Sequence, residues 1–97
     1  MEGYVITMKE QEGNKFETAI LGVFENKEDV WHLLFEFYNT NEGKFEKQSL
    51  NQFENSEGAW VMELVERKGD VTRTIRGEYI ADMQNVTTLK VLIELNW

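Results

Sequence analysis

The chain lacks cysteine and proline entirely among its 97 residues. Without cysteine, disulfide bonds and thiolate metal sites are excluded, and a reducing compartment is favoured. No apolar run approaches the length of a membrane span, and the N-terminal sequence MEGYVITMKE has no basic region followed by an apolar one. We therefore expect a cytoplasmic protein with neither a signal peptide nor a membrane anchor.

Basic residues are scarce, since 10 Lys and Arg stand against 18 Asp and Glu, for a net charge of −8. Most of the excess lies in residues 1–58, which carry 12 acidic and five basic side chains. Such a surface repels nucleic acids and anionic membranes and attracts basic partners. We expect a protein partner with a basic surface, and no direct binding to nucleic acid or membrane.

Histidine and serine are too few to build the usual catalytic sites. His32 is the only histidine, and neither Ser49 nor Ser56 lies in a G-x-S-x-G turn. Glu28, His32 and Glu36 are spaced to share one helical face, which suits metal ligands in principle, but we interpret them as a solvated polar stripe opposite the core. No second histidine or cysteine completes a zinc site, so we expect no enzymatic activity, cofactor or metal.

The apolar composition predicts one globular domain over residues 1–97. Apolar residues make up 41% of the chain and aromatic residues 12%, which suffices for a single core. Residues 4–24 are typical of a β-hairpin around the two-residue loop Gly13-Asn14. That loop sets a register with apolar pairs on one face, which are Tyr4–Val23, Ile6–Leu21 and Met8–Ala19.

Residues 59–80 predict a second hairpin around Gly69-Asp70. Its register gives the apolar-face pairs Trp60–Tyr79, Met62–Gly77 and Leu64–Ile75, and the charge pairs Glu63–Arg76 and Glu66–Arg73. Charge pairs in water contribute only about a few tenths of a kcal/mol each. Gly77 opposite Met62 marks either a bulge or room for a bulky neighbour.

A single helix is predicted over residues 27–40 in the stretch NKEDVWHLLFEFYNTNEG. Asn26 is a typical capping residue, and Glu28 and Asp29 suit the positive end of the helix dipole. Gly43 is expected to end the helix in the left-handed conformation.

The rest of the chain gives one clear segment and one ambiguous one. Residues 89–97 alternate between apolar and other side chains, which predicts a half-buried strand. Residues 44–58 fit either a short strand around Phe45 or one helical turn over residues 50–53. The expected fold is therefore α+β, with an antiparallel sheet of about five strands, formed by two hairpins and the C-terminal strand, and the helix packed on one face.

The predicted helix is more apolar than packing on one sheet requires. Its core stripe consists of Val30, Leu33, Leu34 and Phe37, while Trp31, Phe35 and Tyr38 lie beside that stripe. Two interpretations remain open at this point. Either residues 44–58 or a curled sheet cover the three aromatic side chains, or these side chains form an exposed patch of the kind found in protein interfaces.

The segment DMQNVTTLKVLIELN, residues 82–96, resembles the C-terminal sequence of small acidic anti-CRISPR proteins from phages of Gram-positive bacteria. Such proteins occupy a basic nucleic-acid channel of a host enzyme. The resemblance therefore implies a phage-encoded inhibitor in the host cytoplasm, whose carboxylates take the place of phosphates. No inhibitory residue of that family matches a position in this chain.

These observations predict a non-enzymatic, acidic, protein-binding domain that acts as a phage or mobile-element inhibitor and nucleic-acid mimic. The expected partner-binding residues are Trp31, Phe35, Tyr38, Glu28, Asp29, Glu36 and Glu42. One alternative is a homodimeric accessory protein that uses Trp31, Phe35 and Tyr38 at its own interface. Another is a small-molecule-binding domain with a pocket lined by Trp60, Tyr79 and Phe37.

Overall fold

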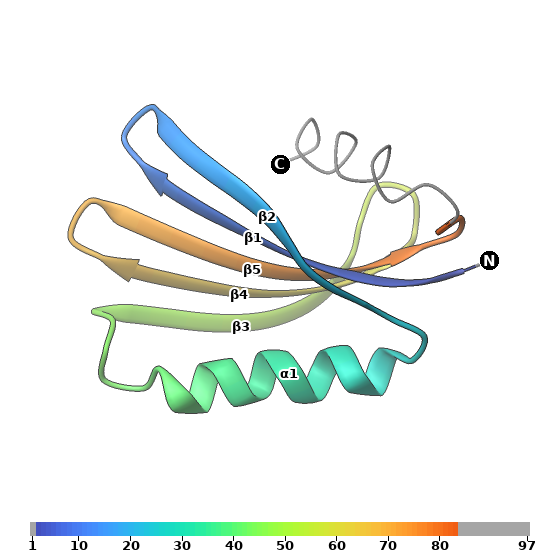
Figure 1. Ribbon diagram of the computed structural model, residues 1–97. Coiled ribbons are helices and arrows are strands. Elements are labelled where there is room, and N and C mark those ends of the chain that lie inside the picture. The colour runs from blue at the N-terminus through green and yellow to red at the C-terminus, as the bar shows by residue number, and fades with distance from the viewer. Residues whose placement is uncertain (1, 84–97) are drawn as a thin grey trace.

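The computed structural model describes residues 2–83 of the chain. Its elements follow in the order β1 (Gly3–Glu12), β2 (Lys15–Phe24), α1 (Lys27–Thr40), β3 (Lys47–Glu54), β4 (Trp60–Lys68) and β5 (Val71–Ile80). The strands form one antiparallel sheet in the order β2-β1-β5-β4-β3, and α1 lies along one face of it (Figure 1). The structure thus confirms the α+β class with a five-stranded antiparallel sheet and one main helix.

The fifth strand of this sheet is β3, from the segment that the sequence left ambiguous. It pairs with β4 from Lys47–Arg67 to Glu54–Trp60, so the helical turn considered for residues 50–53 is wrong. The strand considered around Phe45 begins two residues later, at Lys47. The predicted strand over residues 89–97 lies outside the described residues.

The first hairpin has the predicted register over only part of its length. Strands β1 and β2 pair as predicted from Glu12–Lys15 through Met8–Ala19 to Thr7–Ile20. Beyond that point the register shifts by one residue, because Leu21 is an extra residue in β2, as in a β-bulge. The predicted pairs Ile6–Leu21 and Tyr4–Val23 are therefore wrong, and Ile6 pairs with Gly22 instead.

The second hairpin has the predicted register throughout its ladder. Strands β4 and β5 pair from Val61–Glu78 to Lys68–Val71, a ladder that includes Met62–Gly77, Leu64–Ile75 and both charge pairs. The predicted pair Trp60–Tyr79 lies just beyond the end of that ladder. Tyr4 of the neighbouring strand β1 instead contacts both rings edge-on, with centroid distances of 5.7 Å to Trp60 and 5.7 Å to Tyr79.

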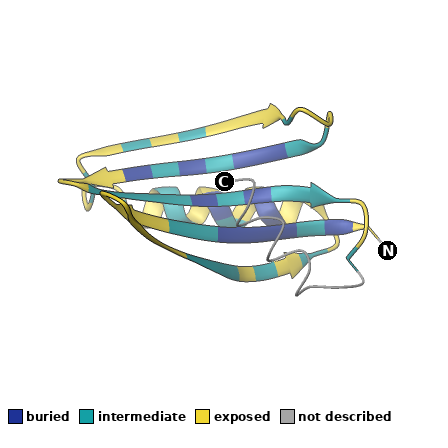
Figure 2. Cartoon of the chain, turned by 90° about the horizontal axis from the view of Figure 1, so that it is seen from above, coloured by how far each residue is buried: buried dark blue, intermediate teal, exposed yellow. Residues whose placement is uncertain are grey.

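Helix α1 has the predicted bounds, and its core stripe lies where the helical wheel places it. Val30 and Leu34 are fully buried, and Leu33 and Phe37 pack against the same cluster. Figure 2 shows buried segments, in dark blue, both on the strands of the sheet and on the helix. The buried cluster comprises Ile6, Val30, Leu34, Met62, Leu64 and Ile75. Asn26 occupies the capping position with extended backbone, but its side chain makes no capping hydrogen bond, contrary to the prediction. Gly43 has the predicted left-handed conformation, with a φ of 82°, but it lies in the turn after α1, and Asn41 is the residue that caps the helix.

The helix lies so close to the sheet because one residue of the sheet has no side chain. A Cβ atom added to Gly77 on β5 would overlap Cγ1 of Val30 on α1. Gly77 therefore makes room for a bulky neighbour, and the bulge alternative does not apply because the β4–β5 ladder is continuous there. This contact fixes the face that α1 presents to the sheet, and hence the face that it presents outward.

Candidate functional site

The outer face of α1 carries a stack of exposed aromatic rings. The Trp31 and Phe35 rings are stacked, with centroids 4.8 Å apart and planes inclined by 20°, and Tyr38 extends the row at 6.2 Å from Phe35. Trp31 is 37% exposed and Phe35 38% exposed, whereas Tyr38 is half-buried and packs against the core. The three aromatic residues therefore lie together, but only Trp31 and Phe35 are substantially open to solvent.

Residues 44–58 do not cover this stack. They form β3 and a turn, and β3 lies in the plane of the sheet as its edge strand. Of the two interpretations left open by the sequence, the structure supports an aromatic surface. We use the name aromatic row for Trp31, Phe35 and Tyr38.

The four acidic residues that the sequence singled out on α1 and directly after it are all exposed. Glu28, Asp29 and Glu36 lie on α1, and Glu42 lies in the turn that follows it. The helix carries acidic residues in its first turn and no basic residue in its last turn. The outer face of α1 is therefore both aromatic and negatively charged, a combination that suits a cationic partner.

A buried carboxylate holds the C-terminal end of α1 against the sheet. Gln48 on β3 donates from Nε2 to the backbone oxygen of Tyr38 at 3.3 Å and to Glu66 Oε2 at 2.7 Å. Asn41, directly after α1, donates from Nδ2 to Glu66 Oε1 at 3.4 Å. Arg73 completes the set with Nη2 2.8 Å from Glu66 Oε1. The sequence predicted the Glu66–Arg73 pair but gave no signal that Glu66 is fully buried and connected to the helix.

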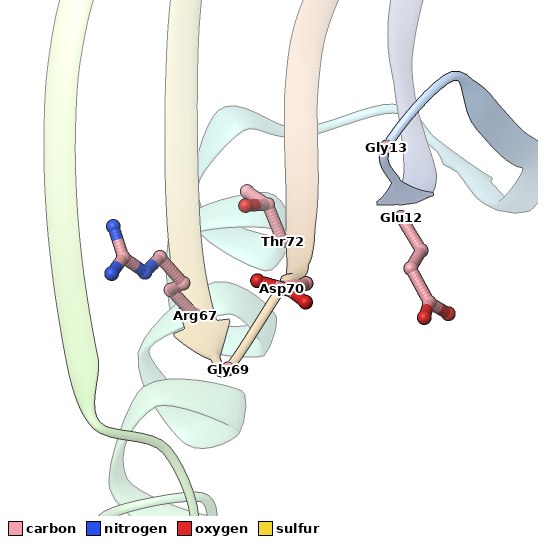
Figure 3. Close-up of a pocket in the computed structure, with 6 residues that line it drawn as sticks. All are labelled: Glu12, Gly13, Arg67, Gly69, Asp70 and Thr72. Atoms are coloured by element: carbon pink, nitrogen blue, oxygen red, sulfur yellow. The ribbon is translucent and has the colours of Figure 1, made fainter.

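A shallow surface hollow lies between the tips of the two hairpins, and no residue of α1 lines it (Figure 3). Its lining residues are Glu12, Gly13, Arg67, Gly69, Asp70 and Thr72. The side chains of Arg67 and Glu12 lie on opposite sides of Asp70 and do not converge on a common point (Figure 3). None of the residues proposed for a small-molecule pocket (Trp60, Tyr79 and Phe37) lines this hollow. Tyr79 contacts Tyr4, and Trp60 and Phe37 pack against the core cluster.

Tyr79, near the C-terminal end of β5, has a raised pKa. Its hydroxyl donates to Glu2 Oε2 at 2.6 Å, and this hydrogen bond to a carboxylate raises the pKa of Tyr79 above 10.0. Because the folded-state pKa is the higher one, the resulting stabilisation is fully present below about pH 10. It is lost as the pH rises through the raised pKa of Tyr79.

We expect Glu2→Gln to lower the pKa of Tyr79 toward its ordinary value, because the substitution removes the nearby negative charge. Nuclear magnetic resonance of ring-labelled tyrosine, followed against pH, measures that pKa directly. Glu57→Gln is the matched control, since Glu57 lies in the turn between β3 and β4 and carries the same charge. An unchanged pKa in Glu2→Gln would show that the hydrogen bond does not form in solution.

Two further properties concern the described residues, 2–83. None of their helices has the length and apolarity of a membrane span. Their His, Asp and Glu side chains form no group of three or more arranged to hold a metal ion. His32 instead contacts the Trp31 ring edge-on, with centroids 5.2 Å apart.

No protein-family model, curated protein or solved structure matches the chain.

Proposed function

We propose that the protein is a non-enzymatic inhibitor that binds a partner protein through the outer face of α1. In this proposal the partner is a cytoplasmic nucleic-acid-binding protein of a bacterial host, and the inhibitor occupies its basic surface. The observation that carries the proposal is the exposed Trp31–Phe35 stack among exposed carboxylates. The resemblance of residues 82–96 to phage inhibitors suggests a phage or mobile-element origin.

Carboxylates and aromatic rings make complementary contributions to such binding. Carboxylates attract the Lys and Arg side chains that otherwise hold phosphates, and this attraction weakens as salt is added. Charge alone gives fast but poorly anchored association. A buried aromatic side chain supplies the desolvated anchor that most protein interfaces require. Trp31 and Phe35 are the residues on α1 that offer this anchor.

We expect Phe35→Asp to abolish association with the partner while leaving the fold intact. Phe35 is 38% exposed, so an aspartate there remains hydrated in the free protein. The substitution removes the ring that stacks on Trp31 and puts a hydrated charge in its place, so the apolar anchor of the interface is lost. Circular dichroism measures the fold, and capture of partner protein by the immobilised variant from a bacterial lysate measures association.

Phe53→Asp is the matched control for this experiment. Phe53 is 41% exposed, but it lies on β3 and not on α1. The control is expected to retain partner capture. A folded Phe35→Asp variant with undiminished capture would exclude the outer face of α1 as the binding surface.

The nature of the partner is tested by displacement. If the captured protein is a nucleic-acid-binding enzyme, high salt and its own DNA or RNA substrate should each release it. Capture that neither treatment weakens would exclude occupation of a basic nucleic-acid site. A dimeric elution volume that becomes monomeric in Phe35→Asp, without any captured partner, would instead support the homodimer.

A further inference from the structure

Three aromatic rings elsewhere in the described chain, the exposed Phe16 and Phe53 and the half-buried Phe45, each lie beside a cation of the chain itself. Lys9 Nζ lies 4.9 Å from the centre of Phe16, and the guanidinium of Arg76 lies 5.9 Å from the centre of Phe53. Arg73 lies 4.8 Å from the centre of Phe45 in the same way. No described Lys or Arg lies over Trp31 or Phe35, although both rings are exposed. The stack on α1 therefore differs from these three rings in having no described lysine or arginine over it.

The lysine closest in sequence to the stack is directed elsewhere. Lys27 lies one helical turn before Trp31, where its ammonium group would be positioned to cover the indole ring. Its Nζ lies instead 5.3 Å from the centre of Trp60, on the sheet. The remaining charged neighbours of the stack on α1 are carboxylates. Glu28 precedes Trp31 by three residues and Glu36 directly follows Phe35.

We propose that the Trp31–Phe35 stack and Glu28 bind an arginine side chain of the partner protein. This inference rests on the proposed function and names the side chain that the same surface recognises. Phe35 stacks on the indole ring. Glu28 lies one helical turn before Trp31 and Phe35 one turn after it, so the two residues flank Trp31 along the helix. A guanidinium placed there stacks on Trp31 and donates hydrogen bonds to the carboxylate of Glu28.

Arginine fits this arrangement better than lysine for two physical reasons. A guanidinium is planar and weakly hydrated, so it stacks on an indole ring at a low desolvation cost. It also presents parallel N–H groups that match both oxygens of a carboxylate. A lysine ammonium is a compact, strongly hydrated charge, and Glu28 alone would attract it no more than any exposed carboxylate does.

Polyarginine and polylysine peptides of equal length are suitable probes for this preference. We expect polyarginine to bind roughly tenfold more tightly than polylysine at the same ionic strength. We also expect it to shift the indole N–H resonance of Trp31. Trp31→Leu and Glu28→Gln should each remove most of the preference for arginine while leaving the weak, charge-driven binding of both peptides.

Matched controls separate this site from the general acidity of the protein. Glu57→Gln removes the same charge as Glu28→Gln, and Phe53→Leu removes an exposed ring away from α1. Both should keep the preference for arginine. Equal affinity for the two peptides, or an arginine preference that survives in Glu28→Gln, would overturn the inference. Glu28→Gln leaves the aromatic rings in place, so it decides the matter even if Trp31→Leu perturbs the helix.

The experiment also separates this inference from the proposed function. Suppose that partner capture depends on Phe35 but the two peptides bind equally well. The outer face of α1 would then still be the protein-binding surface, but recognition of arginine would be excluded. Suppose instead that Trp31 gives a strong preference for arginine but nucleic acid does not release any captured partner. The arginine site would then stand, but the proposed inhibition of a nucleic-acid-binding protein would be excluded.

Discussion

Gly77→Ala is expected to lower the free energy of unfolding by about 3 kcal/mol, although it adds only one methyl group. The new Cβ would overlap Cγ1 of Val30, which is fully buried between α1 and the sheet. A buried valine has few alternative rotamers, so the overlap is relieved only if α1 moves away from β5. Chemical denaturation followed by circular dichroism measures the loss.

A second substitution tests whether the overlap itself is the cause. Val30→Ala alone leaves a cavity and should cost about 2 kcal/mol. Combined with Gly77→Ala, it frees the space that the new methyl group needs, so the double variant should be little less stable than Val30→Ala alone. Losses that simply add would show that the overlap with Val30 is not the cause of the lower stability.

The two hairpins show why the sequence could predict some parts of the fold and not others. The register of the second hairpin follows from a two-residue loop, and the charges at Glu63 and Glu66 agree with it. The first hairpin has an equally short loop, but its prediction fails beyond Ile20. The prediction assumed that the strands pair residue by residue without interruption. A bulge breaks that pattern, and it depends on contacts across the sheet that the hairpin sequence does not show.

Strand β3 was ambiguous because a mostly polar edge strand lacks the alternation that identifies a half-buried one. Its sequence KQSLNQFE contains Leu50, which packs on the core, and Phe53, which is exposed. Gln48 behaves as an interior residue only because Glu66 and the backbone of Tyr38 lie beside it. Such partners come from distant segments, so the sequence of the strand itself does not reveal them.

The candidate site was predictable to the extent that it depends on one helix. Helical periodicity alone separates Val30 and Leu34 from Trp31 and Phe35, and the structure keeps that separation. Whether the aromatic residues are exposed depends on where residues 44–58 lie, which periodicity within the helix cannot determine. Lys27 does not lie over the stack because its side chain is directed to Trp60, and that direction is likewise set by tertiary contacts.

The largest loss of stability is expected at the Glu66–Arg73 pair, which cannot be told from an ordinary surface charge pair in the sequence. Glu66→Met should lower the free energy of unfolding by about 3–5 kcal/mol. The carboxylate of Glu66 is 0% exposed and accepts hydrogen bonds from Arg73, Gln48 and Asn41, so its removal leaves several donors without an acceptor. The C-terminal end of α1, with Tyr38, should also become less protected against hydrogen exchange.

Arg73→Met should be comparably destabilising, because it leaves the buried charge of Glu66 without a cation. The double variant Glu66→Met, Arg73→Met should recover much of the loss, since apolar side chains then replace both charges together. The control is Glu63→Gln in the other charge pair of the same ladder. There the side chains are 25% and 18% exposed and the closest atoms lie 3.6 Å apart, so the expected cost is only about 0.5 kcal/mol. Denaturation curves that place Glu66→Met and Glu63→Gln at the same stability would mean that Glu66 is solvated in solution and does not hold α1 to the sheet.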